Sequence, residues 1–550
     1  MKNRREFIKS GMVGTTGIAI GAMGFSAKSY AAIAGANDRI TIAVIGIRNQ
    51  GTVHLTNYCG LKSSHNVRIK TICDTDEQLF APGLKLIADK TGDKPGTEWD
   101  LRAVFDDKEI DAVSMAIPNH WHALATVWAC QAGKHVYIEK PASHNIWEGR
   151  KMIEAARKYG RRMQVGLNNR SSTNVRDAIQ FLHEGGIGEL YMARALCFKA
   201  RDSYGMAKDG QSPATFHYDR WLGPAPYRPY NEKRSHYNWH WYWDTGNGDT
   251  GNTGPHQLDL ARWGMNKNEH PVSAYSAGGI FGLRRDELPA ESRAKGVRVY
   301  GGVETYGRDK TLQETPNTQT AVYKYRDGTM IEFEVRGRYT NHEGSRGQEV
   351  GNLFFGSEGW LEIDGNNWKA FRGRKKEQFA GSKEGSAREG NHWGNFLDGI
   401  RAGKDEALHA DINEGHYSSA LPHLANISYR VGAEKSNAAI ADAVKSSEAS
   451  KEAYGRMVEH LSVNEVDFAK TPAMLGPLLK IDGAKELFTG SEKEIVAAAN
   501  KSPPIEPIAA ASVGVAKPKT MVPKTAKIMM AKGKKDPSNI LKISSLAKLK

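Results

Sequence analysis

The chain has 550 residues, of which 39% are hydrophobic and 25% charged, as expected for a globular protein with two domains. No apolar run reaches the roughly 18 residues of a membrane-spanning helix. The formal net charge of +14 does not indicate nucleic-acid binding, because eleven lysines against two acids in residues 501–550 supply nine of these charges.

Cysteine usage gives no sign of metal or redox chemistry. The four cysteines are widely scattered and none sits in a C-x-x-C pair, so we expect neither a metal site nor a redox dithiol. They are Cys59, Cys73, Cys130 and Cys197.

The first residues are typical of an export signal. Arg4 and Arg5 precede a weakly apolar stretch over 11–25, and small residues follow it. These are the parts of a secretory signal, and the arginine pair is typical of the twin-arginine route. We therefore expect residues 1–36 to be a signal peptide, and the mature protein to lie in the periplasm or cell envelope.

Alternating strand and helix patterns predict a parallel sheet in the first part of the chain. Short apolar runs end in polar or turn-forming residues, and stretches with helical periodicity separate them. Such βαβ units form a Rossmann domain, which we expect over 37–165. The predicted strands are 39–45, 67–73, 111–117 and 135–138, and the predicted helices are 76–90, 122–132 and 146–159.

Longer strands after Gln164 predict a second domain of α+β type over 166–435. We expect a large, mostly antiparallel sheet with an open face, which would allow two copies of the chain to pair. Residues 436–501 are predicted to be a weakly structured extension, and 502–550 a basic disordered tail. The clearest strands are 189–199 and a hairpin over 319–338, and the clearest helices are 391–401 and 417–431.

A glycine turn follows the first strand, with the sequence Gly46-Ile47-Arg48-Asn49-Gln50-Gly51. Such a turn brings backbone N–H groups to a pyrophosphate at a helix start, but the usual G-x-G-x-x-G motif has glycine where this chain has Arg48. That side chain either crowds the pyrophosphate or binds it. Asp74 closes the second strand, where a carboxylate binds the adenosine ribose and repels a 2′-phosphate. The predicted dinucleotide-binding residues are Gly46, Arg48, Asn49, Gly51 and Asp74, and NAD is favoured over NADP.

Two further strand ends carry polar side chains. The third strand leads into Pro118-Asn119-His120-Trp121-His122, and the fourth into Glu139-Lys140-Pro141. Ligands bind at the carboxyl ends of strands in open α/β sheets, so these side chains are expected at one crevice. Lys140 precedes a proline that ends the strand, and its ammonium group is expected to project into that crevice.

A second cluster of polar residues lies in the later domain. A Gly-rich loop from Asp244 leads into a predicted helix over 253–263, on which His256 and Asp259 share a face. A histidine oriented by a carboxylate suits proton transfer. Removing a hydride from a carbinol carbon also requires removal of the hydroxyl proton. His256 beside Lys140 is the candidate base, while a nicotinamide performs the redox step.

The glycine turn, PNHWH, AGKHVYIEKPAS and HQLD together resemble the Gfo/Idh/MocA family over residues 39–433. These enzymes are glucose-fructose oxidoreductase-like and inositol dehydrogenase-like. The resemblance implies that Lys140 contacts the nicotinamide ribose and the substrate hydroxyl, and that His256 is the proton acceptor. It also implies a cofactor crevice lined by Pro118, Asn119, His122 and Glu139.

The chain departs from the family pattern four residues before His256, where an aspartate is usual and Asn252 stands here. An amide can bond a sugar hydroxyl but cannot share a proton. Either Asp249 takes over that role, or oxidation relies on His256 and Lys140 alone.

Aromatic residues are concentrated between Tyr237 and Trp243. Sugars stack their C–H faces on aromatic rings, so this segment is either part of a carbohydrate site or a loop held by buried aromatics. The candidate substrate-binding residues are Asn168, Arg170, Trp221, Trp239, His240 and Asp249.

Three functions fit these patterns. The leading hypothesis is an exported oxidoreductase that transfers a hydride between a secondary alcohol of a sugar or cyclic polyol and NAD(P). The second is an NAD-dependent glycoside hydrolase that oxidises the sugar transiently and keeps a tightly bound cofactor. The third is a non-catalytic carbohydrate-binding protein.

Overall fold

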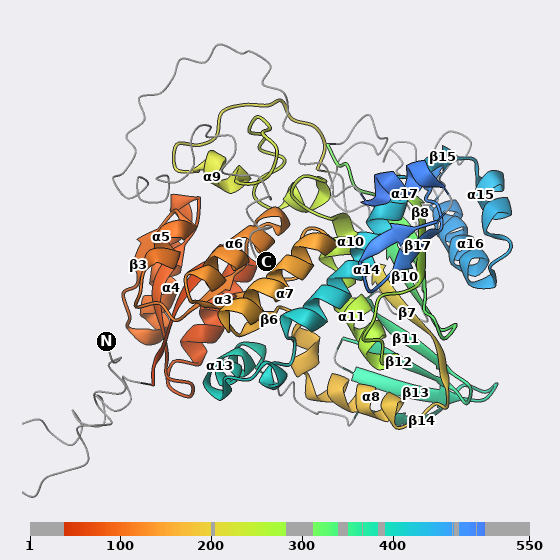
Figure 1. Ribbon diagram of the computed structural model, residues 1–550, viewed down its shortest axis with the longest axis horizontal. Coiled ribbons are helices and arrows are strands. Elements are labelled where there is room, and N and C mark those ends of the chain that lie inside the picture. Colours follow the sequence, from red (N-terminus) through yellow and green to blue (C-terminus); the bar gives the residue numbers. More distant parts are fainter. Residues whose placement is uncertain are drawn as a thin grey trace, which may run out of the picture.

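The computed structural model describes residues 38–199, 204–281, 312–338, 350–382 without 366, and 391–500 without 465, 467–471 and 491. The predicted signal peptide and basic tail lie outside these residues. A Rossmann domain stands beside a second domain built on a large sheet (Figure 1). Among the helices of the described residues, none has both the length and the apolar character that crossing a bilayer requires.

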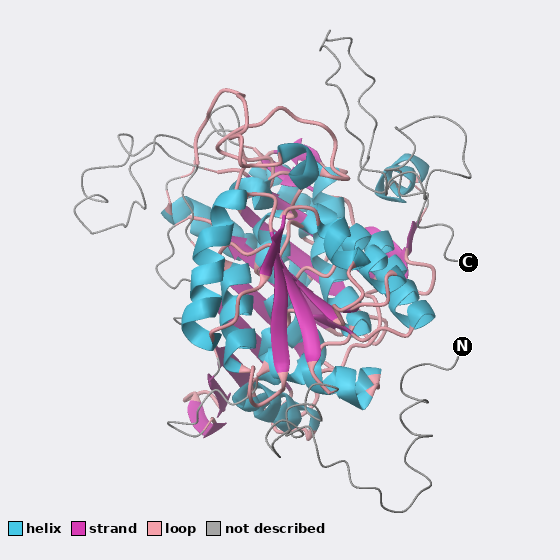
Figure 2. Ribbon diagram, turned by 90° about the vertical axis from the view of Figure 1, so that its left-hand side faces the viewer, coloured by secondary structure: helices cyan, strands magenta, loops and turns pink. Residues whose placement is uncertain are grey.

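The first domain confirms the predicted Rossmann fold. Its six parallel strands have the order β3-β2-β1-β4-β5-β6, and Figure 2 shows them between helices. Every residue of β1 is buried, as expected for a strand covered on both faces. The strands are β1 (Ile40–Ile45), β2 (Val67–Cys73), β3 (Gly96–Glu98), β4 (Ala112–Met115), β5 (His135–Ile138) and β6 (Met163–Val165). The helices are α3 (Gln50–Gly60), α4 (Phe80–Thr91), α5 (Leu101–Asp106), α6 (Asn119–Gln131) and α7 (Ile146–Tyr159).

A later helix returns to this domain. In α13 (His392–Ala402), Trp393, Phe396 and Leu397 pack into the same core cluster as β1 and β2. The Rossmann core is therefore completed by a segment far beyond the boundary predicted at residue 165.

The second domain contains a mixed, mostly antiparallel sheet of twelve strands, as predicted. Within its central part, β7 and β10 pair in parallel. The helices α8 (Thr173–His183), α11 (Gly254–Gly264) and α14 (Ile412–Arg430) pack on one face over a continuous apolar core. The strands of this sheet up to residue 381 are β7 (Leu190–Phe198), β8 (Ser273–Gly279), β9 (Thr318–Lys324), β10 (Met330–Arg336), β11 (Val350–Gly356), β12 (Trp360–Asp364), β13 (Asn367–Arg372) and the edge strand β14 (Glu377–Gly381).

The C-terminal extension is more ordered than predicted. Tyr454, Met457 and Leu461 of α16 belong to a buried cluster with residues of β8 and β9. Arg456 adds ion pairs to Glu332 and Glu334 of β10. The prediction of weak structure was wrong. These apolar residues do recur at helical spacing, but many polar residues lie between them, so the helical pattern is weak in the sequence. After β15 (Ala433–Lys435), which precedes it, the extension contains α15 (Asn437–Val444), α16 (Glu448–Val463), β16 (Ala473–Leu475), β17 (Leu479–Asp482), β18 (Leu487–Thr489) and α17 (Lys493–Asn500).

Candidate functional site

The glycine turn after β1 needs both of its glycines. Gly46 has φ +75°, and a Cβ there would lie 2.3 Å from the Ala116 carbonyl oxygen. A Cβ on Gly51 would lie 1.8 Å from the Gly46 oxygen. The chain can pass from strand to helix this tightly only because these side chains are missing, which leaves the start of α3 open to a pyrophosphate.

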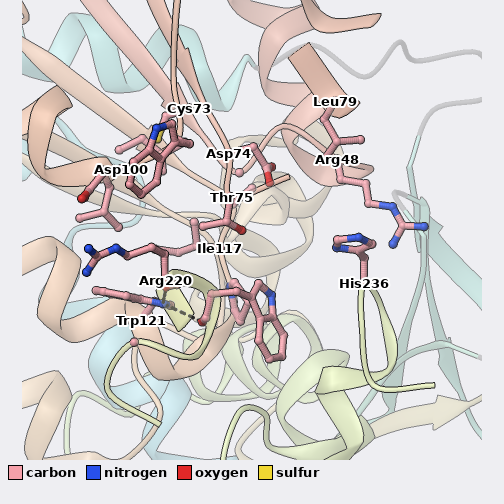
Figure 3. A pocket seen from close by; sticks show the side chains of 18 of the residues that line it. Arg48, Cys73, Asp74, Thr75, Leu79, Asp100, Ile117, Trp121, Arg220 and His236 are labelled. Atoms are coloured by element: carbon pink, nitrogen blue, oxygen red, sulfur yellow. Dashed lines mark hydrogen bonds between the residues drawn. The ribbon is translucent and has the colours of Figure 1, made fainter. Parts of the chain in front are cut away.

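Arg48 does not crowd this turn. Its side chain is exposed and extends to the rim of a cavity, where it faces His236 (Figure 3). Asn49 precedes α3 with φ 35°, and its side chain makes no capping hydrogen bond. The guanidinium of Arg48 therefore stands where it can attract a pyrophosphate instead of excluding it.

Asp74 occupies the predicted position at the end of β2. Its Oδ2 accepts from the Ile47 N–H at 2.9 Å and its Oδ1 from the Asp76 N–H at 3.0 Å. Burial raises the pKa of Asp74 to about 6, although these backbone hydrogen bonds act in the opposite direction. The carboxylate is thus fixed beside the glycine turn, as binding of an adenosine ribose requires.

A cavity of about 180 Å³ lies in front of Asp74. Its walls come from the ends of β1, β2 and β4 and from residues of the segment 204–245 (Figure 3). The glycine turn, the acid at the end of β2 and the apolar walls together fit the adenosine half of a dinucleotide. The lining includes Gly46, Asp74, Thr75, Trp99, Ile117, Pro118, Trp121, Arg220 and Trp221.

The second half of the site joins the two domains at Lys140. Its Nζ donates to the backbone oxygen of Asn252 at 2.8 Å and to the side-chain oxygen at 2.9 Å. Asn252 ends the short helix α10 (Gly248–Asn252), which leads directly into α11. The structure thus brings the predicted residues Lys140 and Asn252 together, 112 positions apart in sequence.

Glu139 lies next to Lys140, and three hydrogen bonds hold its carboxylate in place. Its Oε1 accepts from Gln50 Nε2 and from His54 Nε2, both at 3.0 Å, and its Oε2 accepts from the Lys140 N–H at 3.2 Å. Burial would raise the pKa of Glu139, but the hydrogen bond from His54 and the nearby charge of Lys140 outweigh it and lower the pKa to about 2. A fixed negative charge therefore lies beside Lys140.

His54 was missed in the sequence analysis. It is fully buried, and its Nδ1 lies 2.9 Å from Ser114 Oγ, which completes a chain from Ser114 through His54 to Glu139. His54 lies inside α3 and belongs to no recognisable motif, so the neighbouring sequence does not indicate a functional role. Only the approach of α3 to the end of β5 reveals its role.

His256 lies in the first turn of α11, close to Lys140 and Glu139. Burial and then the positive charge of Lys140 lower its pKa to about 3, against the opposing effect of Glu139. The imidazole is therefore neutral at physiological pH and can accept a proton, which is the first requirement of a base.

The expected pair of His256 and Asp259 is not formed. Asp259 is buried, and its carboxylate accepts from Arg170 Nε and Nη2 at 2.8–3.0 Å and from Ser418 Oγ at 2.6 Å. Arg170, a predicted substrate residue, is likewise buried and also binds Glu414 at 2.9 Å. The side chains of Asp259 and Arg170 thus join η2 (Asn168–Ser171), α11 and α14.

Four other predicted residues support the crevice. Asn119 Nδ2 donates to Asn247 Oδ1 at 2.9 Å, and the buried His122 lies between the carbonyls of Ile117 and Pro141, at 2.8 and 2.7 Å. Asn168 accepts from Tyr137, and the buried Asp249 accepts from Trp241 Nε1 at 3.2 Å. These contacts position the loops around Lys140.

The predicted sugar-binding aromatics lie elsewhere. Trp221 and Trp239 line the cavity in front of Asp74, on the adenosine side, and not the surroundings of Lys140. His240 stacks on Trp239 with ring centroids 3.6 Å apart. Their placement was not predictable, because the segment that carries them folds back over the Rossmann domain.

One group of the described residues brings together side chains of the kinds that hold metal ions: His270, His416 and Glu486. Their contacts are hydrogen bonds to one carboxylate oxygen, with His270 Nε2 at 2.8 Å and His416 Nε2 at 2.5 Å. Arg150 Nη2 lies 2.6 Å from the same oxygen. This cluster ties the turn between β17 and β18 to α14 and α7.

Comparisons with known proteins agree with this arrangement. Residues 40–167 match the oxidoreductase family model with an NAD-binding Rossmann fold, and residues 203–276 match the C-terminal α/β domain of that family. A glycosyl hydrolase family 109 protein of Shewanella pealeana is 24% identical over 209 residues, which are 35% of this chain and 45% of that protein. A levoglucosan dehydrogenase of Pseudarthrobacter phenanthrenivorans is 27% identical over 164 residues, 30% of this chain and 35% of that protein. The chain thus spans less than half the length of these curated relatives.

Solved structures show the same fold. A levoglucosan dehydrogenase in complex with NADH and levoglucosan has a TM-score of 0.50 at 17% identity, covering 70% of this chain and 96% of that one. A putative NADPH-dependent oxidoreductase from Desulfitobacterium hafniense has a TM-score of 0.51 at 15% identity, covering 71% and 96%. Residues 40–167 and 203–276 thus match the two domains of the Gfo/Idh/MocA family of oxidoreductases, and the first of these is an NAD-binding Rossmann fold.

Proposed function

We propose that this protein oxidises a secondary alcohol of a sugar or cyclic polyol with NAD as hydride acceptor. One observation carries the proposal: Lys140 at the end of β5 is fixed against Asn252, next to a neutral His256. The glycine turn and Asp74 hold the other end of the same crevice. Similarity to levoglucosan dehydrogenase supports a sugar as substrate.

The residues of the crevice have separate roles in the reaction. The glycine turn and Asp74 would hold NAD, which would supply the acceptor for the hydride of the carbinol carbon. His256 accepts the hydroxyl proton, and Lys140 orients the substrate oxygen and stabilises its negative charge as it develops. Glu139 stays ionised and balances the charge of Lys140. Burial alone would raise the pKa of Glu139, but the hydrogen bond from His54 and the charge of Lys140 have the larger effect and lower it to about 2. In the reverse direction the same groups return the proton.

The test is a panel of sugars, cyclic polyols and aryl glycosides incubated with the purified chain and NAD. We expect production of NADH from at least one alcohol, and its loss in Lys140→Met. A wild-type chain that binds NAD but oxidises none of the panel, and behaves like Lys140→Met, would favour the non-catalytic binding protein instead.

A second candidate is a glycoside hydrolase that uses transient oxidation. Similarity to glycosyl hydrolase family 109 proteins favours it. Release of the aryl group without net NADH would support this function, whereas steady production of NADH would contradict it.

Export and self-association extend the proposal. Arg4 and Arg5 support twin-arginine export, and cell fractionation of wild type against Arg4→Lys/Arg5→Lys tests it, with retention in the cytoplasm expected for the variant. Pairing through the sheet face would have to use the part that α16 leaves uncovered, and light scattering of the purified chain measures it.

A further inference from the structure

Lys199 directly follows β7 and reaches the helix that carries His256. Cys197, two residues earlier on this strand, belongs to the apolar core that also contains Leu258 of α11. Side chains two residues apart on a strand point to the same face, so Lys199 points toward α11 as well. Its Nζ donates to Thr253 Oγ1 at 3.3 Å. Lys199 therefore reaches the junction between α10 and α11.

Two ammonium groups are bonded to consecutive residues of this junction. Lys140 Nζ donates to both oxygens of Asn252. Lys199 Nζ donates to the hydroxyl of the next residue, Thr253. His256 follows three residues later in the first turn of α11, on the same side of the helix. Burial lowers the pKa of His256 most, and the positive charges of Lys140 and Lys199 lower it further. Lys199 is thus a neighbour of the proposed base.

The charges at this junction are unequal. Glu139 lies beside Lys140 and balances the charge of that lysine. Asn252 stands where the family usually has an aspartate, so a second negative charge is missing. The carboxylate of Asp249 is buried and accepts from an indole N–H at 3.2 Å. In the part of the chain that the structure describes, no carboxylate forms an ion pair with Lys199, and its partner is a neutral hydroxyl.

Lys199 is placed to change partners. It is exposed, whereas Lys140 and Asn252 are half-buried, so it lies on the solvent side of the junction. Its hydrogen bond to Thr253 is long. A hydrogen bond between charged groups is roughly twice as strong as one between neutral groups. A negatively charged substituent on a substrate held at Lys140 would therefore replace the threonine hydroxyl, whereas a sugar hydroxyl would gain little over it.

We infer that the substrate is a sugar acid, and that Lys199 binds its carboxylate while Lys140 and His256 hold the hydroxyl to be oxidised. This inference rests on the proposed function and names its substrate class. The carboxylate supplies the negative charge that the junction lacks and does not itself react. The carbinol carbon loses a hydride to NAD and its hydroxyl loses a proton to His256, so the product is a keto acid together with NADH.

The test compares sugar acids with neutral sugars of the same configuration: glucuronate with glucose, and galacturonate with galactose, each also as the methyl glycoside. The full-length chain and NAD are used, and kcat/KM is measured from NADH formation. Lys199→Met removes the charge, and Lys199→Glu reverses it. Lys369→Met is the matched control, because Lys369 is exposed on β13, three strands from β7 in the sheet. Circular dichroism verifies that each variant is folded.

We expect wild type to prefer the acid of at least one pair by about tenfold or more in kcat/KM, the size of one hydrogen bond to a charged group. Lys199→Met should lose this preference, Lys199→Glu should reverse it, and Lys369→Met should retain it. A wild-type preference for the neutral sugars, or an acid preference that survives in folded Lys199→Met, would overturn the inference while leaving the proposed function intact. A wild-type chain that binds NAD but oxidises neither acids nor neutral alcohols would overturn the proposed function itself.

Discussion

The ammonium group of Lys140 binds both oxygens of Asn252, the main-chain oxygen at 2.8 Å and the amide oxygen at 2.9 Å. Lys140 lies two residues after the end of β5 in the Rossmann domain, and Asn252 ends α10 in the sheet domain. This contact fixes the relative position of the two halves of the crevice. It also explains how an amide can replace the aspartate usual in the family, because anchoring a lysine requires only an acceptor oxygen.

Replacing this amide by a carboxylate should change the pH dependence. In Asn252→Asp, a negative charge near Lys140 and His256 stabilises their protonated forms. We expect the acid limb of the kcat/KM profile to move to higher pH by about one unit, the size of a typical effect of a nearby charge. Asn252→Ala is the comparison, since it removes the acceptor without adding charge. An Asn252→Asp profile that matches wild type would exclude this electrostatic coupling.

Asp74 should make NAD binding sensitive to acid. Burial raises its pKa to about 6, so the carboxylate is charged above that pH and becomes protonated as the pH falls through it. A protonated group accepts ribose hydrogen bonds less well. We expect the Kd for NAD to rise about tenfold from pH 8 to pH 5, equivalent to roughly one charge-assisted hydrogen bond. Fluorescence titration measures it, and a pH dependence that persists in Asp74→Asn would assign the effect to another group.

Gly46 and Gly92 form a matched pair for testing the turn. Both have left-handed backbones, with φ of +75° and +74°, but a Cβ on Gly46 meets the Ala116 oxygen whereas nothing lies within 4 Å at Gly92. Both alanine variants carry the backbone strain of about 1–3 kcal/mol. Gly46→Ala should lose further stability and bind NAD at least tenfold more weakly. Equal effects of the two variants on NAD affinity would show that the turn does not contact the dinucleotide.

Asp259 should contribute to the stability of the fold. Its carboxylate is buried against Arg170, and Asp259→Asn leaves that guanidinium without a full countercharge. We expect the free energy of unfolding to fall by about 3–5 kcal/mol, as for a broken buried ion pair. Asp442→Asn applies the same change to an exposed pair and should leave the free energy of unfolding nearly unchanged. Urea denaturation compares them. A stable Asp259→Asn with an altered pH profile would restore a role in orienting His256.

The sequence predicted what depends on local pattern. The strands β1, β2 and β5 and the helix α7 were located to within a residue, because apolar runs and periodicity are local signals. The strands β3 and β6 have three residues each and were missed. The helix α13 was predicted, but its docking on the Rossmann core was not, since nothing near Trp393 in sequence indicates it.

For the site, too, residues within local motifs were predicted and contacts between distant segments were not. Lys140, Asn252 and His256 were found through motifs and are brought together by the fold. The ion-pair partner of Asp259 was not predicted, because Arg170 lies 89 residues away in the sequence. Likewise Trp221 was expected near the sugar, and only the path of the segment 204–245 shows that it lines the adenosine side.

The most direct test of the whole account is a single turnover with wild type and Lys140→Met, each first saturated with NAD and then mixed with the alcohol identified by the panel. We expect both to bind NAD with similar affinity and wild type to form reduced nicotinamide at up to one equivalent per site. The variant should do so at least about a hundredfold more slowly, the lower range for loss of a group that stabilises a developing negative charge. Reduction by Lys140→Met at the wild-type rate would contradict it.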